Sequence, residues 1–78
     1  MKSPTVQPGA RFLLDCPRGI GEVLVRHVLP CGSEHRVVDL EIESGTFQGT
    51  SLRPDETRRT GDVICLPLAI VEKGMVKA

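Results

Sequence analysis

The sequence predicts one all-β domain, a small barrel of five or six short antiparallel strands with one 3₁₀ turn. The 78-residue chain has two Phe and no Trp or Tyr, so its core must come from valine, leucine and isoleucine. Such an aliphatic core suits strands better than a helical bundle. Short alternating runs are separated by glycine and proline turn signals, and no helical period is longer than one turn. A barrel is favoured over a sandwich because closure removes the exposed edges of a small sheet.

The predicted domain spans residues 9–74, between a flexible arm at residues 1–8 and a flexible tail at residues 75–78. Ten basic and ten acidic residues cancel, which argues against a dedicated nucleic-acid binder. No apolar run reaches the length of about 18 residues that a membrane span needs. Residues 1–9 lack the apolar stretch of a signal peptide, and the three cysteines form no CxxC pair. These features predict a cytoplasmic protein with reduced thiols.

Three strands are predicted in the first half of the chain, at residues 10–15, 22–29 and 35–43. In the first strand, Phe12 and Leu14 share one face. Strict alternation along the second strand puts Leu29 on the same face as Val23 and places Val28 on the opposite face. The third strand alternates most clearly, and its outer face carries a solvated acidic stripe. This stripe consists of Asp39, Glu41 and Glu43.

The second half of the chain is predicted to hold shorter elements. Residues 46–52 form an edge strand or a bulge, because they are polar and include Gly49. Residues 53–60 form a polar loop. A strand at residues 63–66 ends at Pro67, whose nitrogen cannot donate to a ladder. The remaining predicted elements are a 3₁₀ turn at residues 68–70 and a last strand at residues 70–73.

The strands carry more apolar positions than one inward face can use. When Val63 and Cys65 are assigned inward, Ile64 and Leu66 face outward. Four further apolar residues fall on nominal outer faces, namely Leu13, Leu24, Val28 and Val37. Curvature and loops would cover some of them, but a patch of this size favours a surface for self-association or for a protein partner, centred on residues 64–66.

The predicted partner surface combines an apolar anchor with a polar rim. The anchor is the strip formed by Leu13, Leu24, Ile64 and Leu66. A cationic loop around Arg58 supplies the rim that sets specificity, and it would alternatively contact phosphate. Nucleic-acid binding is the weaker interpretation, since no aromatic residue is near for base stacking. The predicted partner-binding residues are therefore Leu13, Leu24, Val28, Ile64, Leu66, Arg53, Arg58 and Arg59.

The sequence gives little support for a metal site. His27, Cys31 and His35 follow each other at intervals of four residues, and Cys65 would complete a set of four. A loop with proline and glycine separates them, and their spacing matches no common zinc pattern. No metal site and no cofactor are predicted.

The sequence gives equally little support for a catalytic site. The thiolate of Cys16 would be stabilised by Arg18, but no base is identifiable beside it. The acidic stripe has no partner that would separate two carboxylate pKa values, as acid–base catalysis requires. No catalytic residue is therefore predicted, and an enzyme is the less favoured interpretation.

The C-terminal part of the chain resembles the end of an SH3-like barrel. Residues 61–73, GDVICLPLAIVEK, are similar to a segment of the type II, trimethoprim-insensitive dihydrofolate reductases, GSVQIYPVAALER. Residues 9–12 and 21–25 also resemble the first two strands of that family. The resemblance implies an SH3-like barrel, and it implies the family's homotetramer, whose single pore binds folate and NADPH.

The pore-lining positions of that family differ in this chain. The segment Gln-Ile-Tyr of the family is replaced by Ile64, Cys65 and Leu66, and Leu14 and Asp15 stand where the first-strand lysines would be. The resemblance is therefore carried over to the barrel and the assembly, but not to catalysis.

Three functions follow from these observations. The favoured one is a non-enzymatic binding, adaptor or inhibitor protein that acts on a protein partner or on copies of itself, of the kind that mobile-element and phage genes encode. The first alternative is an oligomeric small-molecule-binding barrel related to the type II reductases. The second is a nucleic-acid-binding SH3-like barrel.

Overall fold

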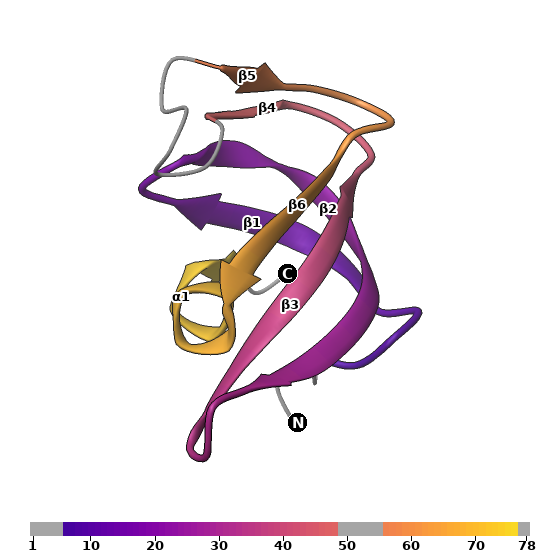
Figure 1. Cartoon of the computed structure of the whole chain (residues 1–78). Helices are drawn as coiled ribbons and strands as arrows, with labels where there is room; N and C mark the ends of the chain where they lie inside the picture. The colour runs from indigo at the N-terminus through magenta and orange to yellow at the C-terminus, as the bar shows by residue number, and fades with distance from the viewer. Residues whose placement is uncertain (1–5, 49–55, 77–78) are drawn as a thin grey trace.

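The computed structural model describes residues 6–48 and 56–76, and these form mostly antiparallel strands with one short helix (Figure 1). The all-β prediction is confirmed at this level. Within these residues no helix is long and apolar enough to cross a membrane. The elements in chain order are β1 (Arg11–Cys16), β2 (Gly19–Cys31), β3 (His35–Ile42), β4 (Thr46–Gln48), β5 (Thr57–Arg58), β6 (Val63–Pro67), α1 (Leu68–Gly74) and β7 (Met75–Val76).

The sheet is organised around β2, which is 13 residues long. Its first half pairs with β1 on one side, and on the other side with β4 at Gly19 and Ile20 and with β3 from Val23 onward; its second half pairs with β3. The sheet continues from β3 to β6, from β1 to β7 and from β4 to β5. Across residues 6–48 and 56–76 no ladder joins β6 to β7, so the sheet is not closed into a barrel. Instead, α1 connects β6 to β7 and contacts β1, β3 and β6 (Figure 1).

The curved sheet has two arms: β1 pairs with the first part of β2 in one, and β3 and β6 continue from β2 in the other. The core lies between these two arms and under α1. Phe12 and Leu14 are buried, as predicted, and Val71 contributes the helix's part of the core. No polar or charged side chain is buried among the described residues. The full cluster comprises Phe12, Leu14, Val23, Val25, Val38, Leu40, Ile42, Phe47, Ile64, Leu66 and Val71.

A β-bulge divides β2 into two parts. Pairing between β2 and β3 passes from Val25 directly to His27 and leaves Arg26 as the extra residue. One extra residue reverses the alternation from that point onward. Val28 therefore packs against the core, and Leu29 is 44% exposed. The prediction that Leu29 faces inward and Val28 outward is wrong for this reason.

The predicted faces of β6 are also reversed. Ile64 and Leu66 are buried, at 8% and 2% exposure, and Val63 is exposed. Ile64 lies opposite Leu40 of β3, and Leu66 lies opposite Val38. Residues opposite each other in an antiparallel pair point to the same face. The inward residues of β3 therefore fix the inward residues of β6, and Ile64 and Leu66, which were predicted to face outward, are part of the core.

The segment after β6 is helical, so the predicted strand at residues 70–73 is wrong. The helix Leu68–Gly74 replaces both this strand and the predicted 3₁₀ turn. Val71 of this helix is completely buried in the core. Gly74 ends the helix against β1, where an added Cβ would lie 2.6 Å from the carbonyl oxygen of Asp15. The strand β7 then pairs with β1.

The region around β4 and β5 is only partly described. β4 confirms the start of the predicted strand at residues 46–52, and residues 49–52 lie outside the described part. β5 lies within the predicted loop of residues 53–60 and pairs with β4.

Candidate functional site

A groove of about 650 Å³ lies between the tip of the β2–β3 hairpin and α1. Its hairpin wall includes Arg36 and Val37, and its helix wall includes Leu68, Ala69 and Glu72. We call it the hairpin groove. Its walls expose Arg36, Ala69 and Glu72 to solvent, so it is an open surface feature rather than an enclosed cavity.

The groove exists because β6 ends before the hairpin does. The ladder between β3 and β6 stops at Val37 and Pro67, and the chain then turns into α1. Pro67 has no N–H with which to extend a ladder. The hairpin continues for two more pairs, of which Cys31 opposite His35 is the last. The tip therefore projects past the sheet, beside the first turn of the helix (Figure 1).

An exposed apolar row borders the groove. Leu29 of β2 lies opposite Val37 of β3, and Val37 lies opposite Pro67 of β6. Leu29 and Pro67 are exposed and Val37 is half-buried. Val37 and Pro67 also line the hairpin groove, so the row and the groove share these two residues. We call these three residues the apolar row.

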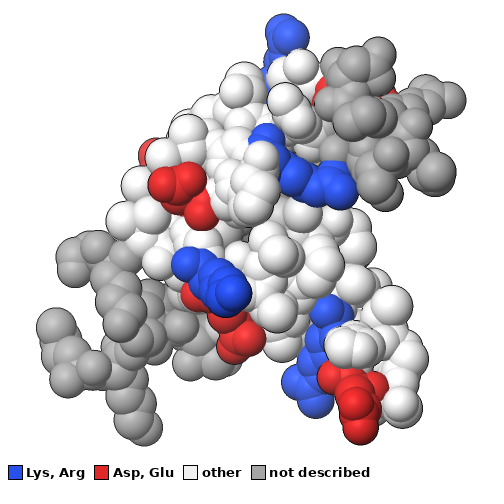
Figure 2. Space-filling view, turned by 90° about the vertical axis from the view of Figure 1, so that its left-hand side faces the viewer, with Lys and Arg blue, Asp and Glu red and all other residues white. Residues whose placement is uncertain are grey.

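The charged side chains around the groove are not paired with other described side chains. Across residues 6–48 and 56–76, no ion pair or side-chain hydrogen bond involves Glu34, Arg36 or Glu72. Figure 2 views the side of the molecule that carries α1. It shows basic and acidic side chains next to each other on the projection at its lower right.

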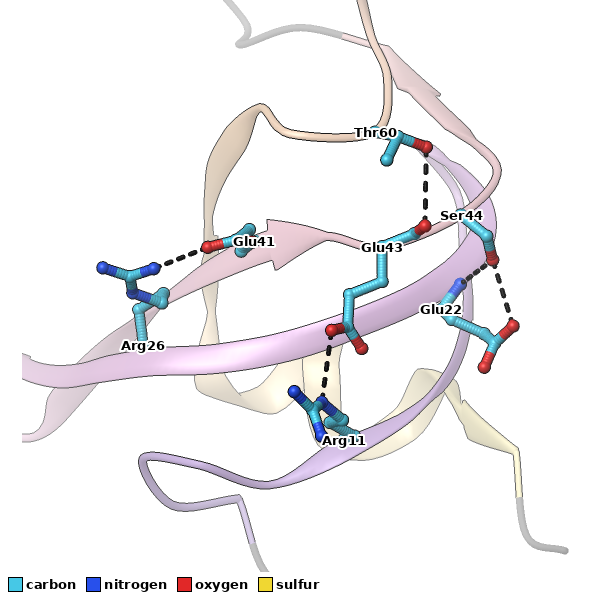
Figure 3. A network of polar contacts seen from close by, with 7 residues as sticks. All are labelled: Arg11, Glu22, Arg26, Glu41, Glu43, Ser44 and Thr60. Carbon is cyan, nitrogen blue, oxygen red and sulfur yellow. Dashed lines mark hydrogen bonds and ion pairs between the residues drawn. The ribbon is translucent and has the colours of Figure 1, made fainter.

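Charged side chains on the outer face of β1, β2 and β3 are paired instead (Figure 3). The Nε of Arg11 lies 3.1 Å from a carboxylate oxygen of Glu43, and Arg26 forms an ion pair with Glu41. Nearby, the hydroxyl of Ser44 donates to Glu22 at 3.2 Å. These contacts make the centre of the outer face a connected polar surface.

The predicted apolar anchor is not brought together. Leu13 is 38% exposed on β1, beside Val76 of β7. Leu24 is half-buried on the outer face, between residues of the polar surface, because it lies opposite both Arg11 and Glu41. The other three predicted apolar contacts are directed inward: Val28 packs on the core, and Ile64 and Leu66 belong to it.

The predicted cationic rim is partly neutralised. Arg58 lies 3.3 Å from a carboxylate oxygen of Glu56. Arg59 is exposed, and its backbone N–H donates to the Asp62 carboxylate at 3.0 Å. Arg53 lies outside the described residues.

A row of polar residues crosses three strands on the outer face. Nδ1 of His27 lies 3.7 Å from Oδ2 of Asp39, and Asp39 lies opposite Cys65. Desolvation raises the pKa of the Cys65 thiol, and its hydrogen bond to Asp39 raises it further. A raised pKa lowers the thiolate fraction, and the thiol contacts a carboxylate rather than an imidazole base. This order of residues does not activate Cys65 as a nucleophile.

No metal-binding cluster is found in the described residues, where no three His, Cys, Asp or Glu side chains come together as ligands. Comparison with known proteins adds no identification: no family model, no curated protein and no solved structure matches the chain. The resemblance to type II dihydrofolate reductases therefore stays a prediction.

Sequence reasoning missed several residues of this site. Strict alternation assigns Leu29 inward, because a bulge at Arg26 leaves no clear mark in the sequence. The sequence pattern predicts a 3₁₀ turn at Leu68 and Ala69, whereas the structure places them on the helix wall of the groove. The useful signal in the sequence is Pro67, which predicts the end of β6. Beyond this point the β2–β3 hairpin has no β6 beside it.

Proposed function

We propose that this chain is a non-enzymatic binding module with an SH3-like fold, which holds a protein partner at the hairpin groove and the apolar row. The observation that carries the proposal is the exposed apolar row of Leu29, Val37 and Pro67, two of whose residues also line the hairpin groove. Such a surface, bordered by charged groups, has the composition of a protein interface.

The strand order supports the SH3-like part of the proposal. The first strand, β1, pairs with the last strand, β7, and a short helix precedes β7. The long strand β2 takes part in both arms of the sheet. The helix α1 connects β6 to β7 and contacts β1, β3 and β6.

The shape of the groove favours a protein chain over a small molecule. Small-molecule sites usually bury most of the ligand surface within a concave pocket. Here the groove opens onto the exposed apolar row, so a small ligand would stay largely in contact with water. A protein segment covers the groove and the row together.

Selection of peptides from a random displayed library tests the proposal. Peptides selected on the folded chain are expected to lose about tenfold or more in affinity for the Leu29→Lys variant. The matched control is Ile20→Lys, which introduces the same charge at an exposed aliphatic residue in the other half of β2. Selected peptides that bind both variants as tightly as the unmodified chain would overturn the proposal, and so would a library that yields no binder.

A further inference from the structure

We propose that the partner held at the hairpin groove is a second copy of this chain, with Arg36 of each copy paired to Glu72 of the other. This inference rests on the proposed function, because it names the partner of the same surface. It follows from the charges on the two walls of the groove.

The groove carries charges of both signs that do not pair with each other within one chain. Arg36 stands on the hairpin wall and Glu72 on the helix wall, and both are exposed. No ion pair joins either of them to another described residue. A cationic partner would leave Arg36 without a counter-charge, and an anionic partner would leave Glu72 without one. A second copy supplies both counter-charges.

A two-fold axis makes this pairing reciprocal. In a two-fold dimer, a contact from residue i of one copy to residue j of the other occurs twice. If the hairpin of one copy lies against α1 of the other, both Arg36–Glu72 contacts form at once. Glu34, in the turn of the hairpin, also lines the groove and is a second charged residue of the hairpin wall.

The apolar row supplies the surface that the ion pairs cannot. Exposed ion pairs contribute little affinity, and their main effect is on orientation and specificity. A stable interface buries about 800 Å² on each partner, which is more than one wall of a groove provides. The row of Leu29, Val37 and Pro67 adjoins the groove and enlarges the contact on each copy.

The polar centre of the outer face is a poorer choice for self-association. Arg11 and Arg26 already have carboxylate partners within the chain. Burying these pairs against a second copy would cost desolvation without a new counter-charge. Arg36 and Glu72 have no such partner to lose among the residues that the structure describes.

Sedimentation velocity over micromolar to millimolar concentrations tests the inference with two charge reversals. We expect the unmodified chain to form a dimer. Arg36→Glu alone and Glu72→Arg alone should each weaken the dimer by about tenfold or more, because each places like charges together twice. An equimolar mixture of the two variants should restore the dimer, because both contacts between one variant and the other then join opposite charges again.

The control is Lys73→Glu, which reverses a charge on the same helix without lining the groove and should leave the dimer unchanged. Far-UV circular dichroism verifies that each variant is folded. A chain that is monomeric throughout would overturn the inference, while a groove-dependent peptide would still support the proposed function. A dimer that ignores both reversals, or two weakened variants that the mixture fails to restore, would also overturn it.

Discussion

The two halves of β2 differ in what surrounds them. The first half lies in the middle of the sheet, with β1 on one side and β4 and then β3 on the other, and contributes Val23 and Val25 to the core. Beyond Arg26 the strand has β3 as its only described neighbour and ends in a projecting hairpin. One strand thus serves the core at one end and a candidate interface at the other, and a single extra residue separates the two roles.

The largest expected effect contrasts a core leucine with a hairpin leucine. Leu40→Ala removes a fully buried side chain opposite Val25 and should lower the free energy of unfolding by about 2–5 kcal/mol. Leu29→Ala removes a side chain that is 44% exposed and should change it by about 0.5 kcal/mol or less. Urea unfolding curves measure both values. Equal losses would show that the hairpin end of β2 is as much part of the core as its first half.

A smaller effect on stability is expected from deletion of Arg26, the residue that separates the two halves. The deletion removes the bulge and an exposed ion pair with Glu41, so stability should change by about 1 kcal/mol or less. The direction of the hairpin should change, because bulges bend the strand that contains them. We therefore expect the deletion to reduce the free energy of binding of a selected peptide at the hairpin groove by more than it reduces the free energy of unfolding.

The matched control for this deletion is Arg26→Gln, which removes the ion pair and keeps the bulge. It should retain peptide binding. If Arg26→Gln reduces binding as strongly as the deletion, the side chain rather than the bend is responsible.

The smallest expected effect concerns Cys65, on the polar row across β2, β3 and β6. Because the pKa of this thiol is raised, its thiolate fraction at about pH 8 is low, and alkylation should be slow. Asp39→Asn removes the carboxylate that accepts from the thiol and should speed alkylation of Cys65 several-fold. Mass spectrometry of the modified peptides measures the rate. An unchanged rate would show that Asp39 does not influence the thiol.

The same pKa shift implies a dependence of stability on pH. A thiol with a raised pKa in the folded state stabilises that state below the pKa of the unfolded thiol. This contribution is lost as the pH rises through the pKa of the folded thiol. Asp39→Asn should reduce the loss, which unfolding curves at alkaline pH would measure.

Some parts of the fold were predictable because local pattern and tertiary structure agree. β1 and the start of β3 fall where alternation and turn signals place them, and Phe12 and Leu14 face the core as predicted. The candidate site was less predictable. Its residues come from a hairpin, the end of β6 and the first turn of α1, and no local pattern indicates that these three meet.

The sequence by itself determined the all-β class, the aliphatic core and most strand positions, because these depend on composition, period and turn residues. Only the tertiary structure decided which face of β6 is inward and where β2 changes face. Alternation divides the residues of a strand into two sets, but it does not say which set faces the core. Pairing with β3 makes that choice for Ile64 and Leu66, and the bulge at Arg26 makes it for Leu29. The exposure of Leu29 and Pro67 in the apolar row is a consequence of those two choices.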